Sequence, residues 1–590
     1  RHSRNEMRLD WQAPRSICVG IFDAALAAAQ RTGSAIRSVR AMGGSMCVAE
    51  KQGSPADEEV IVKGSPMEEK ERSHFRAPRA SFIVNDEAIC KKEPHAQGAL
   101  SIIVLGASGD LAKKKTYPSL MALFADQFLP SCANIVGYAR SVQSDEEFRE
   151  KLRPWLLKVQ PSEHIVKSFL KRCWYCQGNY DSAGDFMKLN SRLKDLEVAG
   201  EGKVANRLFY FAIPPDAFLS SARSIKQAAM SSSGFNRLIV EKPFGHDLSS
   251  AKKLMSDLGA VFSEEFIYRI DHYLGKEIIQ NLIMFRFGNR FLEPLFSHEH
   301  VSSVRITFKE NFGTEGRGGY FTNYGIIRDI IQNHLMQVLS TVAMEMPKTL
   351  VGADAGKCIR DAKVAVIKAA KQIKLDDVVV GQYVAADGKP GYLDDDSIKD
   401  KDKAAFVPTF AAMAMYIDTP RWKGVPFLVK AGKALDERKA EIRIQLREAG
   451  TAGKAFGGAY DFPRNELVMV MQPNEAIYLK MNVKTPGLQS APVESELDLS
   501  YGDRFQGSFN PDAYTRLILE ALRGKQEDFV RSDEITSSWE LFDPLLKGLE
   551  KKKPMPYEYG SRGPEAADQL FVSKGFVHAA DYEWSGGKSP

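Results

Sequence analysis

The chain has 590 residues, 44% of them hydrophobic and 26% charged, and its formal net charge is +5. This composition is typical of a globular protein, and the length predicts two large domains. The small charge argues against a nucleic-acid-binding protein, and no apolar run approaches the ~20 residues that cross a bilayer.

The seven scattered cysteines argue against a disulfide scaffold. Cys173 and Cys176 have the C-x-x-C spacing, but no second pair or histidine couple completes a redox or metal site.

We expect residues 1–96 to be an extension outside the folded core. Residues 1–46 contain seven arginines, no lysine and three acids, which is typical of an organelle transit peptide. A disordered tail, or sequence upstream of a true start at Met42 or Met46, explains the same composition. Residues 51–80 alternate charges with glycine and proline, which predicts disorder. The compartment is therefore either the cytoplasm or a plastid or other organelle.

The first ordered unit is a strand, a glycine turn and a helix. Ser101–Leu105 is a short β-branched run, as expected of a buried parallel strand. Gly106 and Gly109 follow it, and their backbone can approach a pyrophosphate closely. Ala112 is small enough for the next helix to pack tightly on the sheet. This order of elements predicts a dinucleotide-binding fold.

The residue after the next strand distinguishes the two nicotinamide cofactors. The strand Asn134–Tyr138 is followed closely by Arg140, near the place where an NAD site has an acid for the ribose 2′-hydroxyl. A guanidinium pairs instead with a 2′-phosphate, so this position predicts NADP. The alternative is an arginine that is only solvated at the surface.

Two more strands end in polar residues on the same edge of the predicted sheet. Leu208–Ile213 contains Tyr210, and Arg237–Val240 is followed by Glu241 and Lys242. Ligands of open parallel sheets bind outside the carboxyl ends of the strands. Lys242 is therefore a candidate to hydrogen-bond a substrate oxygen or the nicotinamide amide, and a plain salt bridge is the alternative.

The segment Arg269–Glu277, R-I-D-H-Y-L-G-K-E, gathers an acid, an imidazole, a phenol and an ammonium after another strand. His272 and Lys276 are four residues apart, so they share a face if both lie on the first turn of the helix that follows. A helix N-terminus favours anions. With Tyr273 these residues predict a phosphate pocket, whereas the alternative is a charged helix start that only solvates a turn.

Beyond about residue 300 the pattern changes to strands in which polar and apolar residues alternate. Val304, Ile306 and Phe308, for example, alternate with Arg305 and Thr307, which predicts one buried and one solvated face. The strands expected here are Val301–Phe308, Phe410–Ile417, Lys439–Leu446, Glu466–Met471 and Ala476–Val483. We therefore expect an α+β domain with a large, mainly antiparallel sheet.

Two polar residues interrupt the apolar helical segment Gly325–Met336, which follows a glycine loop at 313–319 that we expect to be mobile. These residues are Asp329 and His334. A histidine in such a segment is more often a satisfied core residue than a catalyst. Oxidation of an alcohol, however, needs a base with a pKa near neutrality, and histidine is the usual one. Asp271 is our candidate for the carboxylate that orients the ring.

Six motifs make the chain similar to the glucose-6-phosphate dehydrogenase family over about residues 98–585. They are G-A-S-G-D-L-A at 106–112, E-K-P-F-G at 241–245, R-I-D-H-Y-L-G-K-E at 269–277, G-T-E-G-R-G-G-Y-F at 313–321, G-I-I-R-D-I-I-Q-N-H at 325–334 and G-K-A-L-D-E-R-K-A-E at 432–441. With the strand patterns, we expect an α/β Rossmann-type NADP-binding domain at 97–272 and an α+β substrate-binding and oligomerisation domain at 273–590. The resemblance implies oxidation of glucose 6-phosphate to its lactone with NADP, by a homodimer or homotetramer.

The resemblance also implies the roles of individual residues. His334 is the proton acceptor, and Asp271 orients it. The substrate site is formed by Lys242, His272, Tyr273, Lys276, Glu310, Asp329, Lys433, Arg438 and Gln472. The catalytic NADP site is formed by Gly106, Ala107, Ser108, Gly109, Asp110, Leu111, Ala112, Lys113, Arg140, Tyr210 and Lys242. No metal is implied.

Some members of the family carry a second, structural NADP in the C-terminal domain. Its positions in this chain are Lys430, Lys439, Arg443, Tyr478, Lys480, Asp498, Arg531 and Trp584. The match is partial, because Lys430 and Val470 stand where members with that site have arginine, and His578 where they have tyrosine. A lysine is only a point charge and lacks the fork that grips a phosphate.

Two other functions fit parts of the sequence. Another NADP-linked sugar or aldose oxidoreductase also has the lysine of the E-K-P motif, and such an enzyme would not depend on a substrate phosphate. A non-catalytic nucleotide sensor would retain the fold but lose the histidine–aspartate pair. Both Asp271 and His334 are present in this chain, which argues against a sensor.

Overall fold

The computed structural model describes residues 93–198, 204–450, 454–457, 462–488, 491–505 and 510–578. Our expectations for residues 1–92, and the assignment of Trp584, therefore lie outside the described residues. Within them, no helix combines the length and the apolar character needed to cross a membrane.

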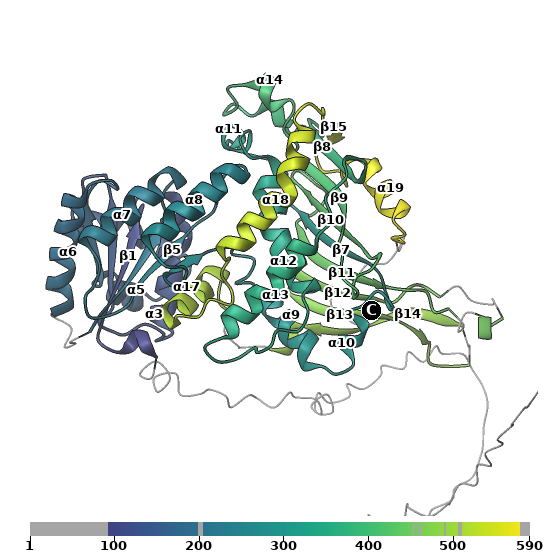
Figure 1. Ribbon diagram of the computed structural model, residues 1–590, viewed down its shortest axis with the longest axis horizontal. Coiled ribbons are helices and arrows are strands. Elements are labelled where there is room, and N and C mark those ends of the chain that lie inside the picture. The colour runs from purple at the N-terminus through teal and green to yellow at the C-terminus, as the bar shows by residue number, and fades with distance from the viewer. Residues whose placement is uncertain are drawn as a thin grey trace, which may run out of the picture. The chain divides into compact units, whose positions relative to one another are not determined.

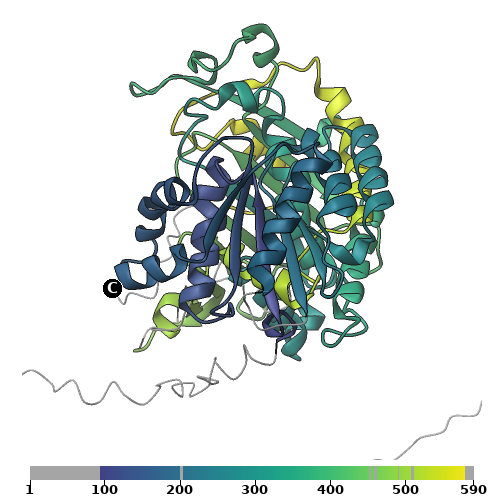
Figure 2. The same cartoon turned by 90° about the vertical axis from the view of Figure 1, so that its left-hand side faces the viewer.

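A six-stranded sheet, parallel throughout, forms the first half of the described chain, in the order β3-β2-β1-β4-β5-β6. Its strands are β1 (Ala99–Leu105), β2 (Asn134–Ala139), β3 (Cys173–Gln177), β4 (Ala205–Phe211), β5 (Asn236–Val240) and β6 (Ile267–Arg269). Every residue of β1 is buried, because helices cover both faces of the sheet (Figure 2). The predicted Rossmann-type α/β fold is confirmed.

Two apolar cores separate this sheet from its helices. The helical elements of this half are η1 (Pro94–Ala96), η2 (Ala112–Thr116), α3 (Tyr117–Ala125), α4 (Asp145–Leu157), α5 (Glu163–Leu170), α6 (Ala183–Val198), η3 (Pro215–Ala217), α7 (Phe218–Ala228), α8 (Leu248–Val261) and η4 (Glu264–Phe266). The core with α3, α4 and α5 also contains side chains of α17 (Ala513–Arg523), among them Leu517 and Leu522. A helix from the predicted second domain thus completes the first.

A nine-stranded sheet dominates the second half, in the order β14-β13-β12-β11-β7-β10-β9-β8-β15. Its strands are β7 (Val301–Lys309), β8 (Val378–Val384), β9 (Phe410–Tyr416), β10 (Pro426–Gly432), β11 (Lys439–Leu446), β12 (Glu466–Gln472), β13 (Ala476–Lys484), β14 (Pro492–Ser500) and β15 (Met555–Glu558). It is mixed, because β10 pairs with β7 and β15 with β8 in parallel, while the other pairs are antiparallel. The expected mainly antiparallel sheet is confirmed, although alternation did not reveal β8, β10, β14 or β15.

Most of the remaining helices cover one face of the nine-stranded sheet, whereas the last described helix lies at the other face. The remaining helical elements are α9 (Glu277–Gly288), α10 (Leu292–Leu295), α11 (Gly318–Phe321), η5 (Ile327–Leu335), α12 (Met336–Ala343), α13 (Ala355–Ala369), η6 (Leu375–Asp377), η7 (Tyr392–Asp394), α14 (Lys401–Ala404), α16 (Tyr501–Arg504), α18 (Ser532–Leu549) and α19 (Glu565–Ser573). Figure 1 shows α12, α13 and α18 along this face. Val304, Ile306 and Phe308 of β7 point into their core, so Arg305 and Thr307 point to the opposite face, as alternation predicts.

The segment that carries His334 is a π-helix over nine residues, η5, which continues into α12. The predicted helix at 325–336 is confirmed, but its wider winding was not expected. A π-helix shifts the direction of the side chains that follow it, and such segments are frequent at functional sites.

The C-x-x-C pair lies on β3 and forms no joint site. Cys173 is buried in the core on one side of the sheet, whereas Cys176 packs against the core on the other. Residues three apart on a strand point to opposite faces, and both thiols are free.

Candidate active site

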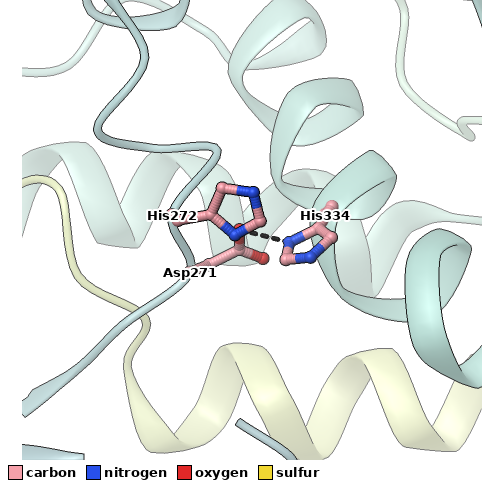
Figure 3. Close-up of side chains that lie close together, drawn as sticks. All are labelled: Asp271, His272 and His334. Atoms are coloured by element: carbon pink, nitrogen blue, oxygen red, sulfur yellow. Dashed lines mark hydrogen bonds and ion pairs between the residues drawn. The ribbon is translucent and has the colours of Figure 1, made fainter. Parts of the chain in front are cut away.

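The centre of the site is a hydrogen bond between η5 and the segment after β6. The Nδ1 atom of His334 lies 2.5 Å from Oδ1 of Asp271, and the two side chains are 2% and 4% exposed. Figure 3 shows the two rings of His334 and His272 beside the Asp271 carboxylate. The backbone N–H of Tyr273 donates to the same Oδ1 at 3.0 Å, which fixes the carboxylate. The predicted pairing of residues 271 and 334 is therefore present.

The protonation states at this pair suit a general base. Burial lowers the pKa of His334 below 6.5, while the neighbouring Asp271 carboxylate raises it in part. Burial alone would raise the pKa of Asp271, but His334 lowers it to about 2. Near neutral pH the imidazole is thus neutral and the carboxylate charged. With Nδ1 held by the carboxylate, Nε2 is the nitrogen left to accept a proton.

Residues 271–276 form a tight turn that ends at the N-terminus of α9. The N–H groups of Leu274, Gly275 and Lys276 donate to the carbonyls three residues earlier, and Lys276 is the N-cap of α9. His272 therefore lies in the turn before the helix, which corrects our expectation that it shares the first helical turn with Lys276. Burial lowers the pKa of His272, and the charge of Lys276 nearby lowers it further.

Tyr273 has a polar atom that lacks a partner among the described residues. Its ring stacks on His334 with centroids 4.8 Å apart, and its side chain is 1% exposed. Its hydroxyl is buried without a hydrogen bond, which is costly unless a ligand supplies one. Lys276 lies beside it, with Nζ 5.2 Å from the ring centroid and 3.1 Å from Oε1 of Gln472. These donors match a phosphate.

The other predicted substrate residues converge on the same place. Lys242 Nζ donates to the carbonyl of Asp329 at 2.8 Å and lies 3.3 Å from its Oδ1. Lys433 forms a short ion pair with Glu310. The charges of Lys242 and Lys433 lower the pKa of Asp329 against the raising effect of burial. Arg438 is exposed. Burial raises the pKa of Tyr273 and lowers that of Lys276, and the positive charge of Arg438 lowers both.

Three ligand atoms of Asp271, His272 and His334 lie within 4.8 Å of one another, which is close enough for a metal site. Tetrahedral zinc with bonds of about 2.0–2.1 Å separates its ligand atoms by roughly 3.3 Å. The Nδ1–Oδ1 distance of 2.5 Å is shorter. A hydrogen bond occupies that space, and the arrangement is that of an oriented base.

The glycine turn leads from β1 to η2 with a backbone that only glycine adopts easily. Gly106 has φ +85°, and a Cβ there would meet the Ala212 carbonyl oxygen at 2.1 Å. Ala107 and Ala112 are buried, whereas Ser108 and Asp110 are exposed and Gly109, Leu111 and Lys113 are partly exposed. The predicted turn thus presents backbone and small side chains at the strand end, which fits a pyrophosphate.

Two further residues predicted to bind the cofactor differ in exposure. Arg140 follows β2 and is exposed, and its guanidinium lies 5.6 Å from the ring centroid of Tyr180. Tyr210 is fully buried in β4, and its hydroxyl donates to Oε1 of Glu241 at 2.5 Å. Burial raises the pKa of Glu241 to about 7. The sequence singled out Tyr210 but not this buried acid beside Lys242.

Comparison with known proteins decides the family. Residues 103–281 match the model of the glucose-6-phosphate dehydrogenase NAD binding domain, and residues 283–585 match that of its C-terminal domain. The chain belongs to the glucose-6-phosphate dehydrogenase family.

Several relatives span almost the whole described chain. The chain is 48% identical to the cytoplasmic isoform of glucose-6-phosphate 1-dehydrogenase from Solanum tuberosum, over 82% of this chain and 94% of that protein. It is 47% identical to the enzyme from Dictyostelium discoideum, over 84% of this chain and 98% of the other. A solved glucose-6-phosphate dehydrogenase in complex with glucose 6-phosphate superposes with a TM-score of 0.77 at 44% identity, covering 82% and 99%. A second solved structure, of the enzyme from Mycobacterium avium, superposes with a TM-score of 0.69 at 30% identity, over 82% of this chain and 99% of the other.

A second group of cations lines a cavity on the face of the nine-stranded sheet opposite α12, α13 and α18. Its basic residues are Arg305, Lys309, Lys430, Lys439, Arg443, Lys480 and Arg562, and its acids are Asp436, Glu437, Glu441, Glu466 and Asp568. The cations are extensively paired with the acids: Arg443, for example, contacts Glu441 at 2.8 Å and Glu466 at 3.0 Å. Burial lowers the pKa of Lys430 to about 8.

This cavity gathers only part of the residue set that we predicted for a structural NADP. Lys430, Lys439, Arg443 and Lys480 line it, and Tyr478 contacts Arg443 at 3.4 Å. Asp498 pairs across from Tyr478 on β14.

Arg531 does not belong with this cavity, which corrects the prediction. Its guanidinium pairs with Asp361 at 2.7 Å and with Asp533 at 2.7 Å, at the start of α18. That helix lies beside α12 and α13 on the other face of the sheet (Figure 1). The cavity is lined instead by Arg562, which sequence reasoning missed although it lies in a glycine-flanked turn.

Proposed function

We propose that this chain oxidises D-glucose 6-phosphate to 6-phospho-D-glucono-1,5-lactone with NADP, the first step of the oxidative pentose phosphate pathway. The observation that supports it most is the buried Asp271–His334 hydrogen bond next to the turn at 271–276. A base and a set of phosphate donors lie side by side there, as oxidation of a phosphorylated sugar requires.

The residues of the site have separate tasks. Nε2 of His334 accepts the proton of the sugar's C1 hydroxyl, and Asp271 stabilises the imidazolium that forms. His272, Tyr273 and Lys276 bind the phosphate, and the unpartnered Tyr273 hydroxyl gains an acceptor in it. The sugar hydroxyls are bound by Lys242, Glu310, Asp329, Lys433, Arg438 and Gln472. Binding of the remote phosphate contributes to alignment at C1.

The dinucleotide is held by the glycine turn at Gly106–Lys113, and NADP is selected by Arg140. A bound nicotinamide would supply the acceptor for the hydride that leaves C1. The exposed guanidinium of Arg140 is suited to a 2′-phosphate. Residues 97–272, completed by α17, form the cofactor domain, and residues 273–590 form the substrate and assembly domain. The enzyme is a homodimer or homotetramer and acts in the cytoplasm, with a plastid or other organelle as the alternative.

Formation of reduced nicotinamide, measured by near-ultraviolet absorbance, tests this proposal. We expect turnover with glucose 6-phosphate and NADP, and a loss of at least about tenfold in kcat/KM when free glucose replaces the phosphorylated sugar. Equal turnover of both sugars would favour a general aldose oxidoreductase. Tight NADP binding without turnover of either would favour a nucleotide sensor.

A further inference from the structure

A residue outside the predicted site closes one side of the phosphate turn. Tyr514 lies in the first turn of α17, far from His272 in sequence, yet the two rings are nearly parallel. Their planes differ by 8° and their centroids are 5.8 Å apart, which is the geometry of an offset stack.

The ring of His272 is enclosed by three aromatic neighbours. His334 meets it edge-on at 4.5 Å and Tyr273 edge-on at 5.0 Å, and Tyr514 faces it. His334 and Tyr273 already have catalytic or phosphate-binding tasks. Tyr514 faces the free side of this group of rings through its stack on His272, and its own ring also lies 5.8 Å from Lys115 Nζ. It is therefore suited to fix the orientation of the His272 ring.

Tyr514 is itself held in place by the start of α17. Asp512 is the N-cap of this helix and accepts the Tyr514 backbone N–H at 3.0 Å. The other oxygen of Asp512 accepts from Lys115 Nζ of η2 at 3.0 Å. A Cβ on Gly275 would come within 2.6 Å of the Ala513 carbonyl oxygen. The first turn of α17 therefore packs directly on the phosphate turn and is tied to the helix that follows the glycine turn.

We propose that Tyr514 is a positioning residue that holds the His272 imidazole in the orientation that binds the substrate phosphate. This inference rests on the proposed function, since it assigns His272 to the phosphate. A helix that completes the cofactor domain thereby sets the affinity for phosphorylated sugars, without contacting the reacting carbon.

The test compares Tyr514→Ala with Tyr514→Phe, which keeps the ring. An offset stack contributes enough for its loss to raise KM about threefold to tenfold. We expect Tyr514→Ala to raise KM for glucose 6-phosphate, and the inhibition constant of inorganic phosphate, by this factor. Because the base is untouched, kcat and the dissociation constant of NADP stay within about twofold of wild type. Tyr514→Phe behaves as wild type.

Leu519→Ala is the matched control for loosening of α17, because Leu519 lies on the same helix and packs in the core of the first sheet. We expect it to lower the melting temperature and leave KM unchanged. If Tyr514→Ala does not fold, Tyr514→Leu removes the stack and retains apolar volume, with the same expected rise in KM.

The inference is overturned if Tyr514→Ala, or Tyr514→Leu in its place, leaves KM and phosphate inhibition unchanged. It is also overturned if kcat falls with KM constant, or if Leu519→Ala raises KM equally. Lack of wild-type activity on glucose 6-phosphate would reject the proposed function itself. An active wild type with an unaffected Tyr514→Ala variant rejects only this inference.

Discussion

Replacement of His334 by asparagine should remove most of the turnover while substrate binding stays intact. Positioned general bases contribute factors of about 10²–10⁴, which corresponds to about 3–5 kcal/mol in the activation free energy. The side chain is 2% exposed, so bulk water has little access to take over as base. We therefore expect kcat to fall toward the upper end of this range, with KM close to wild type because the phosphate contacts remain.

The same substitution takes the imidazole hydrogen bond from the charged, buried Asp271, and loss of a hydrogen bond to a charged group costs about 1.5–3 kcal/mol of folding free energy. The double variant Asp271→Asn, His334→Asn removes that charge and keeps an acceptor for the Tyr273 N–H. We expect it to recover melting temperature relative to the single variant, with turnover still low. Loss of activity from the missing base is thereby separated from loss through unfolding.

Steady-state kinetics over a range of pH complete the assay. Only a neutral imidazole can accept the proton, and the pKa of His334 lies below 6.5. Wild-type kcat/KM should therefore rise with pH below 6.5 and then level off. This acidic limb should disappear in His334→Asn. Near-normal turnover, or an unchanged acidic limb, in the folded variant would refute the assignment of His334 as the base.

Three further substitutions test other parts of the molecule. Lys276→Ala should raise KM for glucose 6-phosphate about tenfold to a hundredfold with little change in kcat; a collapse of kcat at constant KM would contradict phosphate anchoring. Arg140→Ala should lower kcat/KM for NADP by a similar factor and leave kcat/KM for NAD unchanged. An equal loss with both cofactors would count against recognition of the 2′-phosphate. Burial raises the pKa of Asp528, which accepts from Gln280, from 3.8 to about 7. The folded state therefore holds this proton more tightly, and stability falls as pH rises from about 4 to about 7. Asp528→Asn should raise the unfolding free energy by about 1–3 kcal/mol at pH 8 but not at pH 4; an equal shift at both would show a cause other than ionisation.

The sequence predicted that Asp271 and His334 lie together, although only Asp271 follows a strand. Motif spacing placed Asp271 after β6 and His334 in a helical segment, and the fold brings them together. What periodicity did not reveal is the π-helical winding of η5, because a change of winding leaves the apolar stripe nearly unchanged. The sequence also did not reveal the buried Glu241 as the partner of Tyr210, because an acidic residue that follows a strand is expected to be exposed to solvent.

The error at Arg531 has a physical cause: a sequence does not say which face of a sheet a distant segment reaches. Arg531 was grouped with the cations of β11 and β13, yet α18 carries it to the opposite face. Mobility of the loop at 313–319 stays a prediction, and within this loop Thr314, Gly316 and Gly318 donate hydrogen bonds to Asp395. Nothing near the loop in sequence signals that anchor.

The placement of α17 has a consequence for how the polypeptide folds during synthesis. The parallel sheet and its own helices are translated early. Part of their apolar surface is buried only when Leu517, Ile518 and Leu522 pack on it. Until α17 has been synthesised, the nascent domain exposes an apolar patch. Such surfaces are prone to aggregation and are bound by chaperones. Truncations before Ala513 should therefore yield insoluble material even though every strand of the first sheet is present.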